Sequence, residues 1–413
     1  MRESLRFVLV GHVDHGKSTL IGRLLCDTGA LALDRLEEAK AAARALGAEA
    51  GAELAFLLDH LQEEREGALT IDTAQSFFST PARDYVLIDA PGHAEFLRNM
   101  LTGASQADAA VLIVDVSRGV QEQTCRHAYL LAFLGVKEVI VALNKMDLVG
   151  YAEAPFRRLE GEVEALLQAV GLAPKFSVPI SARAGENIAS PSSLMGWYRG
   201  PSLLEALDAL PGPVPPEDKP FVFPIQDVYD LEGKRVAVGR VEAGVLRPGA
   251  KARLLPGGAV VKISSIERFE EQPAAAHPGE AVGVTLEGPA PAALARGQVL
   301  CPPGAEMAVT TSFEARLFCL AEAGLKKGEE LTLRLATQEV PARLEAISAR
   351  LDSASLEVVE RDATVLGSLE AGQARLATAE PLVATRFSDL QPLGRFVLAR
   401  GEEICAGGII TGL

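Results

Sequence analysis

The chain of 413 residues lacks long apolar runs and any obvious targeting segment. No run of about 18 apolar residues is present, so no transmembrane helix is expected. The apolar stretch near the N-terminus runs directly into a glycine-rich motif without a small-residue cleavage site, so we expect no secretory signal. These absences favour a cytoplasmic protein that makes no membrane contact.

Paired cysteines and an excess of basic residues are also missing. The five cysteines are scattered without paired spacing, which favours reduced thiols. The net charge is −15, with 40 basic residues against 55 acidic ones. Proteins that hold nucleic acid usually carry a basic stripe, so this balance argues against a nucleic-acid partner.

The pattern along the chain changes near residue 210. Up to that point, short β-branched runs alternate with longer helical patterns, which is typical of a mostly parallel sheet with helices on both faces. A chain of this length is expected to form two or three domains. The expected strands are at 7–10, 85–88, 110–114, 139–143 and 176–180. An Ala/Glu-rich stretch at 34–66 is interpreted as a helical insertion.

The remainder of the chain has a different character. A proline-rich linker at 211–220 permits neither a helix nor a central strand. Beyond it the segments are short, alternating and punctuated by glycine, which predicts antiparallel barrels. We therefore expect an α/β nucleotide-binding domain at 1–212, followed by β-barrel domains at 219–303 and 307–413.

The stretch GHVDHGKST at 11–19 fits G-x-x-x-x-G-K-[ST] and stands between an expected strand and an expected helix, as a P-loop does. Its glycines let successive backbone N–H groups point at phosphates, and the helix N-terminus adds a favourable dipole. Lys17 would reach the β- and γ-phosphates, and Ser18 would offer its hydroxyl to Mg²⁺. The alternative is a glycine-rich turn with a chance lysine. The predicted phosphate site consists of Asp14, His15, Gly16, Lys17, Ser18 and Thr19.

The motif NKMD at 144–147 ends another expected strand, at the sheet edge where such folds bind ligands. Asp147 can accept hydrogen bonds from N1–H and the 2-amino group of guanine, whereas adenine would leave the carboxylate without partners. The nucleotide is therefore predicted to be GTP, unless 144–147 is only a polar turn. The predicted base site consists of Asn144, Lys145, Asp147, Ser181, Ala182 and Arg183.

Three further residues suggest a nucleotide-dependent switch. Asp89 ends an expected strand and could hold the Mg²⁺ shell through water. The N–H of Gly92 could meet the γ-phosphate, and a glycine there permits a flip when that phosphate leaves. Thr70, in a loop before a strand, could reach Mg²⁺ with its hydroxyl, although a plain threonine at a strand start is the alternative.

Together these motifs resemble the translation-factor class of GTPases, in which GHVDHGKST, DAPGH, NKMD and SAR occur in this order. VGRVEAGVLRPGAK looks like the second-domain barrel of that class. Within the class, the chain most resembles the GTPase subunit of bacterial sulfate adenylyltransferase. LLDHLQEEREGALTID, DAPGHAEFLRNMLTGASQADAAVLIVD and MGWYRGPSLLEAL carry this resemblance.

The resemblance implies a heterodimer with a small subunit that makes adenosine 5′-phosphosulfate and pyrophosphate from ATP and sulfate. GTP hydrolysis on this chain would help to drive that uphill reaction. It also implies that His93 positions the attacking water. His93, together with Lys17 at the β- and γ-phosphates, is therefore expected to be catalytic. A metal-ligand role for His93 has no matching ligand set, and a passive turn histidine remains the alternative.

Two features depart from the sulfate-activating pattern. The P-loop carries His12 and His15, as elongation factors do, and Ala68 stands where the switch usually has glycine. A translation factor that delivers aminoacyl-tRNA is therefore the second hypothesis, and a nucleotide-sensing GTPase is the third. Because Leu413 follows soon after the last expected barrel strand, no fused adenylylsulfate kinase domain is expected.

Overall fold

The computed structural model describes residues 4–31, 75–89, 107–212 and 217–413, the last range without 232, 269–270, 289–293, 354 and 356. The chain forms two compact units. Unit 1 comprises Met1–Pro213 with Ser353–Leu356, and unit 2 comprises Val214–Asp352 with Glu357–Leu413. Within the described ranges, no helix has the length and apolar character needed to cross a membrane.

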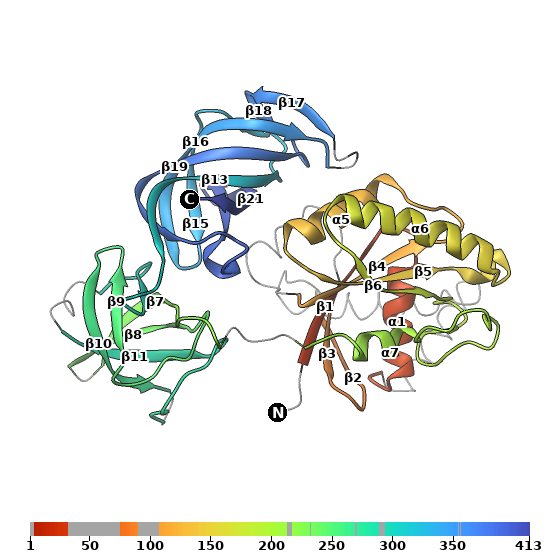
Figure 1. Cartoon of the computed structure of the whole chain (residues 1–413), viewed down its shortest axis with the longest axis horizontal. Coiled ribbons are helices and arrows are strands. Elements are labelled where there is room, and N and C mark those ends of the chain that lie inside the picture. The colour runs from red at the N-terminus through yellow and green to blue at the C-terminus, as the bar shows by residue number, and fades with distance from the viewer. Residues whose placement is uncertain are drawn as a thin grey trace. The chain divides into compact units, whose positions relative to one another are not determined.

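Unit 1 is built on a six-stranded sheet with the order β2-β3-β1-β4-β5-β6 (Figure 1). Strand β2 runs antiparallel at one edge, and the other strands are parallel. All seven residues of β4 are buried, as expected where helices cover both faces. The strands are β1 (Ser4–Gly11), β2 (Gln75–Ser79), β3 (Asp84–Asp89), β4 (Ala109–Asp115), β5 (Glu138–Asn144) and β6 (Pro174–Pro179).

Helices α5 (Glu122–Phe133) and α6 (Glu153–Ala169) lie on one face of this sheet, and α1 (Lys17–Asp27) and α7 (Leu203–Asp208) lie on the other (Figure 1). Leu20, Ile21 and Leu24 of α1 recur at helical spacing and are fully buried against apolar residues of β1. Burying each such side chain contributes about 2 kcal/mol to folding. The apolar face of α1 therefore fixes the position of the loop from which the helix starts.

Unit 2 contains two barrels of antiparallel strands. The first is closed in the order β10-β11-β8-β7-β12-β9. Its core residues alternate along the strands with exposed ones, as the period of a half-buried strand requires. The strands are β7 (Phe223–Leu231), β8 (Lys234–Arg240), β9 (Lys251–Leu255), β10 (Ala259–Glu267), β11 (Ala281–Glu287) and β12 (Val299–Cys301).

The second barrel follows the order β15-β20-β21-β13-β19-β16, and pairing of β15 with β16 closes the ring. Strand β17 adds to the outside of β16, and β14 pairs with β18. The 3₁₀ turn η3 (Gln391–Leu393) precedes β20. The strands are β13 (Ala308–Cys319), β14 (Leu325–Lys326), β15 (Glu330–Leu335), β16 (Gln338–Leu351), β17 (Val358–Ala363), β18 (Val365–Leu366), β19 (Ala371–Ala384), β20 (Arg395–Arg400) and β21 (Glu403–Gly412).

The expected fold class, an α/β unit followed by two antiparallel β-barrels, is confirmed. All five strands expected in the first part are present, as β1, β3, β4, β5 and β6. Strand β2 was not expected, because it is a partly exposed edge strand and QSFFS shows no long apolar run. The predicted helical insertion at 34–66 lies outside the described residues.

Candidate nucleotide site

The carboxyl ends of β1, β4 and β5 meet at one edge of the sheet. Gly11 at the end of β1 pairs with Ile113 of β4. Asp115 at the end of β4 pairs with Asn144 at the end of β5. The P-loop and the NKMD motif follow directly from this edge, which is where open α/β sheets bind ligands.

The P-loop backbone turns sharply into α1 at Gly16. Gly16 is the N-cap residue with φ of 96°, and a Cβ at this position would collide with the amide nitrogen of Asn144. Only glycine meets both demands. Because Gly16 has no side chain to cap the helix, the N–H groups of the first turn, where Ser18 and Thr19 lie, are oriented for an anion.

The side chain of Lys17 folds back onto the P-loop backbone. Its ammonium donates hydrogen bonds to the carbonyl of Gly11 at 2.7 Å and to that of His12 at 3.1 Å. Burial lowers the pKa of Lys17, and the carboxylates of Asp89 and Asp14 act in the opposite direction. The lysine therefore lies inside the P-loop, within electrostatic reach of Asp89.

The base motif continues into the 3₁₀ turn η1 (Met146–Val149), which contains Asp147. The hydroxyl of Ser181 donates to Asp147 Oδ1 at 2.6 Å, which orients the carboxylate. The guanidinium of Arg23, in α1, donates to the carbonyl of Arg183 at 2.9 Å. The structure thus brings the NKMD segment and the SAR segment together, although 34 residues separate Asp147 from Ser181.

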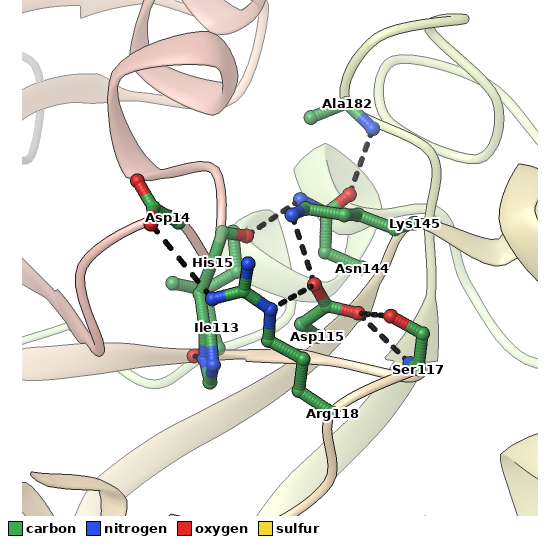
Figure 2. A network of polar contacts seen from close by, with 9 residues as sticks. All are labelled: Asp14, His15, Ile113, Asp115, Ser117, Arg118, Asn144, Lys145 and Ala182. Carbon is green, nitrogen blue, oxygen red and sulfur yellow. Dashed lines mark hydrogen bonds and ion pairs between the residues drawn. The ribbon is translucent and has the colours of Figure 1, made fainter.

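Asn144 joins the P-loop to the SAR segment. Its side-chain nitrogen donates to the carbonyl of His15 at 2.9 Å, and its side-chain oxygen accepts from the N–H of Ala182 at 2.9 Å (Figure 2). The side chain is buried. One amide therefore holds two loops that are far apart in sequence.

Asp115 forms a polar network beside Asn144 that the sequence did not predict (Figure 2). Its carboxylate lies 2.8 Å from the ammonium of Lys145 and accepts two hydrogen bonds from Ser117. Burial would raise the pKa of Asp115, but the hydrogen bonds from Lys145 and Ser117 outweigh it and hold that pKa below its usual value. Arg118 extends the network to Asp14, with 3.8 Å between its guanidinium and the carboxylate. The sequence signal was an acidic residue ending a buried strand, as Asp89 does.

His15 is fully buried beneath the P-loop. Its Nδ1 lies 3.4 Å from the carbonyl of Ile113, and its Nε2 has no hydrogen-bond partner among the described residues. Burial lowers the pKa of His15 to about 4. The imidazole is therefore neutral at pH 7 and offers no cation to a phosphate, so a contact with the nucleotide would come from its backbone.

Three predicted switch residues, Thr70, Gly92 and His93, lie outside the described residues. Asp89 is described and ends β3, where it pairs with Leu9, two residues before the P-loop begins.

Family models match the chain in three successive blocks. The model for the elongation factor Tu GTP binding domain matches residues 2–212, which is half of the chain. The chain belongs to the elongation factor Tu/1-alpha family of GTPases. Elongation factor Tu domain 2 matches 234–301, and the GTP-eEF1A C-terminal domain-like model matches 312–411. This translation-factor family is therefore represented in both units.

Individual members of the family match nearly the whole chain. Elongation factor 1-alpha of Pyrococcus furiosus is 39% identical, covering 98% of this chain and 97% of that protein. Elongation factor 1-alpha of Archaeoglobus fulgidus is 38% identical, covering 99% of this chain and 98% of that protein. A solved structure, sup35 complexed with GMPPNP, is 25% identical with a TM-score of 0.47 over 100% and 95% of the two chains. A TM-score this low adds nothing to the assignment, which rests on the sequence matches.

These matches contradict two predictions: that the chain is a subunit of sulfate adenylyltransferase, and that its partner is the small subunit of that enzyme. Relatives that match nearly the whole chain at 37–39% identity are named elongation factor 1-alpha. The flanking segments that suggested it are therefore not specific to that subunit, whereas His12 and His15 in the P-loop indicated the correct branch. The expectation of no nucleic-acid partner is contradicted by the same relatives, which are named as elongation factors. It rested on net charge, which sums both units and does not describe local surfaces.

The cofactors of this family member are GTP and Mg²⁺. The residues present fit the ion, because Ser18 in the first turn of α1 and Asp89 at the end of β3 supply oxygen donors, which Mg²⁺ prefers. The carboxylate of Asp89 also acts electrostatically on Lys17 and opposes the lowering of the pKa of that lysine by burial. When bound, Mg²⁺ neutralises charge on the β- and γ-phosphates.

Proposed function

We propose that this chain is a translation elongation factor that delivers aminoacyl-tRNA to the ribosome in a cycle governed by GTP. The observation that carries the proposal is the 37–39% identity to proteins named elongation factor 1-alpha, which extends over 98–99% of the chain. A similarity limited to the GTP-binding unit would be compatible with many partners. The similarity here includes both barrels, so it favours a shared partner as well as a shared nucleotide.

Within this proposal, the two ends of the nucleotide have separate binding groups. Asp147 accepts hydrogen bonds from the guanine base, and Lys145 lies beside it. The N–H of Ala182 and the side chain of Ser181 close the base end. Lys17 and the first turn of α1 bind the phosphates. The hydrogen bonds of Ser181 with Asp147 and of Ala182 with Asn144 support this assignment.

The switch residues have proposed roles of their own. Thr70 and Asp89 would complete the Mg²⁺ shell with Ser18, Gly92 would contact the γ-phosphate, and His93 would position the attacking water. Phosphoryl transfer depends mainly on positioning and charge stabilisation, so a residue that orients one water is useful.

We also propose three domains, at 1–212, 219–303 and 307–413, and a cytoplasmic location. The strands of the first barrel fall within 223–301 and those of the second within 308–412, which supports the domain limits. The five cysteines are all free thiols, which supports a reducing compartment.

Binding of aminoacyl-tRNA tests the proposal. The chain is loaded with either a non-hydrolysable GTP analogue or GDP and titrated with charged tRNA in a filter-binding assay. The GTP-analogue form should bind about tenfold more tightly or better, since ligand-dependent coupling of this kind typically spans about 5- to 150-fold. It should also slow hydrolysis of the aminoacyl ester, and binding should weaken as salt rises.

Deacylated tRNA is the matched control for that experiment. It shares the phosphate backbone and differs only at the aminoacyl end, so it measures non-specific electrostatic binding. A chain that binds neither tRNA, or that binds both equally in both nucleotide states, is not an aminoacyl-tRNA carrier.

A further inference from the structure

Trp197 is the only tryptophan of the chain, and it contacts the loop that carries the base motif. Its indole N–H donates a hydrogen bond of 2.8 Å to the backbone carbonyl of Tyr151. Tyr151 follows Asp147 by four residues, whereas Trp197 lies 46 residues further along the chain. The segment near the end of unit 1 is thus tied directly to the base loop.

The base loop has a backbone that needs support. Lys145, Gly150 and Tyr151 have φ values of 66°, 61° and 58°, in the left-handed region that residues with a side chain seldom occupy. Each such residue other than glycine costs about 1 kcal/mol or more and persists only where its surroundings fix it. Inside the loop, the N–H of Tyr151 donates to the carbonyl of Met146 at 2.9 Å. The carbonyl of Tyr151 accepts the hydrogen bond from Trp197.

Trp197 is itself held on several sides. Its ring packs against Phe156 of α6 with 5.2 Å between the ring centroids. The guanidinium of Arg157 lies 5.9 Å from the Trp197 ring centroid, within the range of a cation–π contact. Arg157 is oriented in turn by Glu153 and Glu160 at 3.2 Å and 2.9 Å. The Trp197 ring is therefore held against α6, and the hydrogen bond from its N–H links that position to the base loop.

We propose that Trp197 is a positioning residue for guanine recognition: by holding the Tyr151 carbonyl, it keeps the loop that carries Asp147 in register with the base. The N–H of Tyr151 donates to the carbonyl of Met146, the residue before Asp147, and the hydroxyl of Ser181 orients the Asp147 carboxylate. The backbone of Tyr151 therefore connects the tryptophan to the recognition carboxylate. The inference rests on the guanine site proposed for 144–147 and is independent of the tRNA partner.

The test compares GDP with inosine diphosphate. The two differ only in the 2-amino group, which Asp147 contacts, so the ratio of their Kd values reports the alignment of the carboxylate. Trp197→Phe removes the indole N–H and keeps an aromatic ring against Phe156. The preference for GDP should fall about three- to tenfold in this variant, the range expected for one lost hydrogen bond. A role in packing alone would weaken both nucleotides equally and leave the ratio unchanged.

Two further proteins separate loss of the indole N–H from a change in packing: a control variant at a neighbouring residue and an isosteric analogue of tryptophan. Tyr198→Phe removes a hydroxyl that donates to the carbonyl of Pro201 at 3.2 Å, on the same segment but away from the base loop, and should keep the wild-type ratio. Because the chain has a single tryptophan, expression in a tryptophan auxotroph can replace Trp197 with benzothienylalanine. That residue has sulfur in place of the N–H, so it keeps the shape of the ring and should lower the ratio as Trp197→Phe does.

The outcomes separate the inference from its premise. If the wild-type chain prefers GDP and the benzothienylalanine protein shows the same preference, the role of Trp197 is wrong. That outcome does not contradict the guanine site. A wild-type chain with no preference for GDP over inosine diphosphate overturns the guanine site and the role of Trp197 together. A reduced preference that is confined to the two changes at Trp197 supports the inference.

Discussion

Buried polar side chains differ in kind between the two units. Among the described residues, unit 1 buries the charged side chains of Arg83 and Asp115, whereas the buried polar residues of unit 2 are the neutral Gln338, Thr378 and Thr385. A buried charge is costly unless it is paired, so charges persist mainly where a partner or a function requires them. Among the described residues, the buried charged side chains therefore lie in unit 1, where Asp115 pairs with Lys145 of the NKMD motif.

The largest expected effect is a loss of GDP affinity when the P-loop lysine of unit 1 is removed. Lys17→Ala removes an ammonium that donates to the carbonyls of Gly11 and His12 and that we propose binds the phosphates. Affinity for GDP should fall by roughly 100-fold or more, because several charge-assisted hydrogen bonds are lost. Equilibrium binding of a fluorescent GDP analogue measures it. Affinity within a few-fold of wild type would contradict the placement of Lys17 at the phosphates.

The second prediction uses the neutral histidine buried in unit 1. The pKa of His15 is about 4 in the folded chain against 6.5 for an ordinary histidine, so the unfolded chain binds more protons between these values. The free energy of unfolding should therefore fall as pH drops from 6.5 to 4, by up to about 3 kcal/mol from this residue. Urea unfolding of wild type and His15→Gln at several pH values, with GDP saturating, measures the difference. Identical pH dependence in both proteins would rule out this contribution.

The third prediction moves to unit 2 and separates stability from nucleotide binding. The buried amide of Gln338 donates to the carbonyl of Val383 at 2.9 Å and accepts from its N–H at 2.8 Å. Gln338→Ala should lower the free energy of unfolding by about 2 kcal/mol, because two buried backbone groups lose their partner. GDP affinity should stay unchanged. Gln373→Ala, at an exposed position of β19, is the matched control and should stay within about 0.5 kcal/mol of wild type.

The smallest effect sharpens the role of the polar network in unit 1. Asp115→Asn keeps the side-chain size but removes the charge that faces the ammonium of Lys145 at 2.8 Å. We expect GDP affinity to fall about tenfold, which corresponds to the loss of about one charge-assisted hydrogen bond. Arg118→Ala is the control, because its two ion pairs are long and half-exposed and should be worth less than about 1 kcal/mol. Equal losses in both variants would contradict a specific pairing of Asp115 with Lys145.

The sequence predicted what local spacing encodes. Gly16 and Lys17 stand in a motif whose geometry is set within nine residues, and Asp147 stands in a motif of four residues, so both motifs could be predicted without a structure. The network of Asp115 could not be predicted in the same way. It depends on the register that pairs Asp115 with Asn144, and that register comes from the packing of whole strands.

The local sequence pattern could not predict the identity of the partner either. Alternating strands such as β16 predict a barrel, because their inward residues must be apolar, but the same alternation suits any barrel of this kind. Which molecule the outward residues recognise is decided by surface chemistry that periodicity does not encode. The sulfate-activating interpretation failed for this reason, and the comparison over the full length of both barrels corrected it.

Asn144 has a consequence for how nucleotide leaves the site. Its amide is donor to one loop and acceptor from another, so an aspartate of the same size would face the carbonyl of His15 with oxygen against oxygen. Since the same side chain joins the loop proposed to bind the base to the loop proposed to bind the phosphates, we expect release of the two ends of the nucleotide to be coupled. Dissociation should follow a single exponential, and an agent that displaces either loop should accelerate the departure of the entire nucleotide.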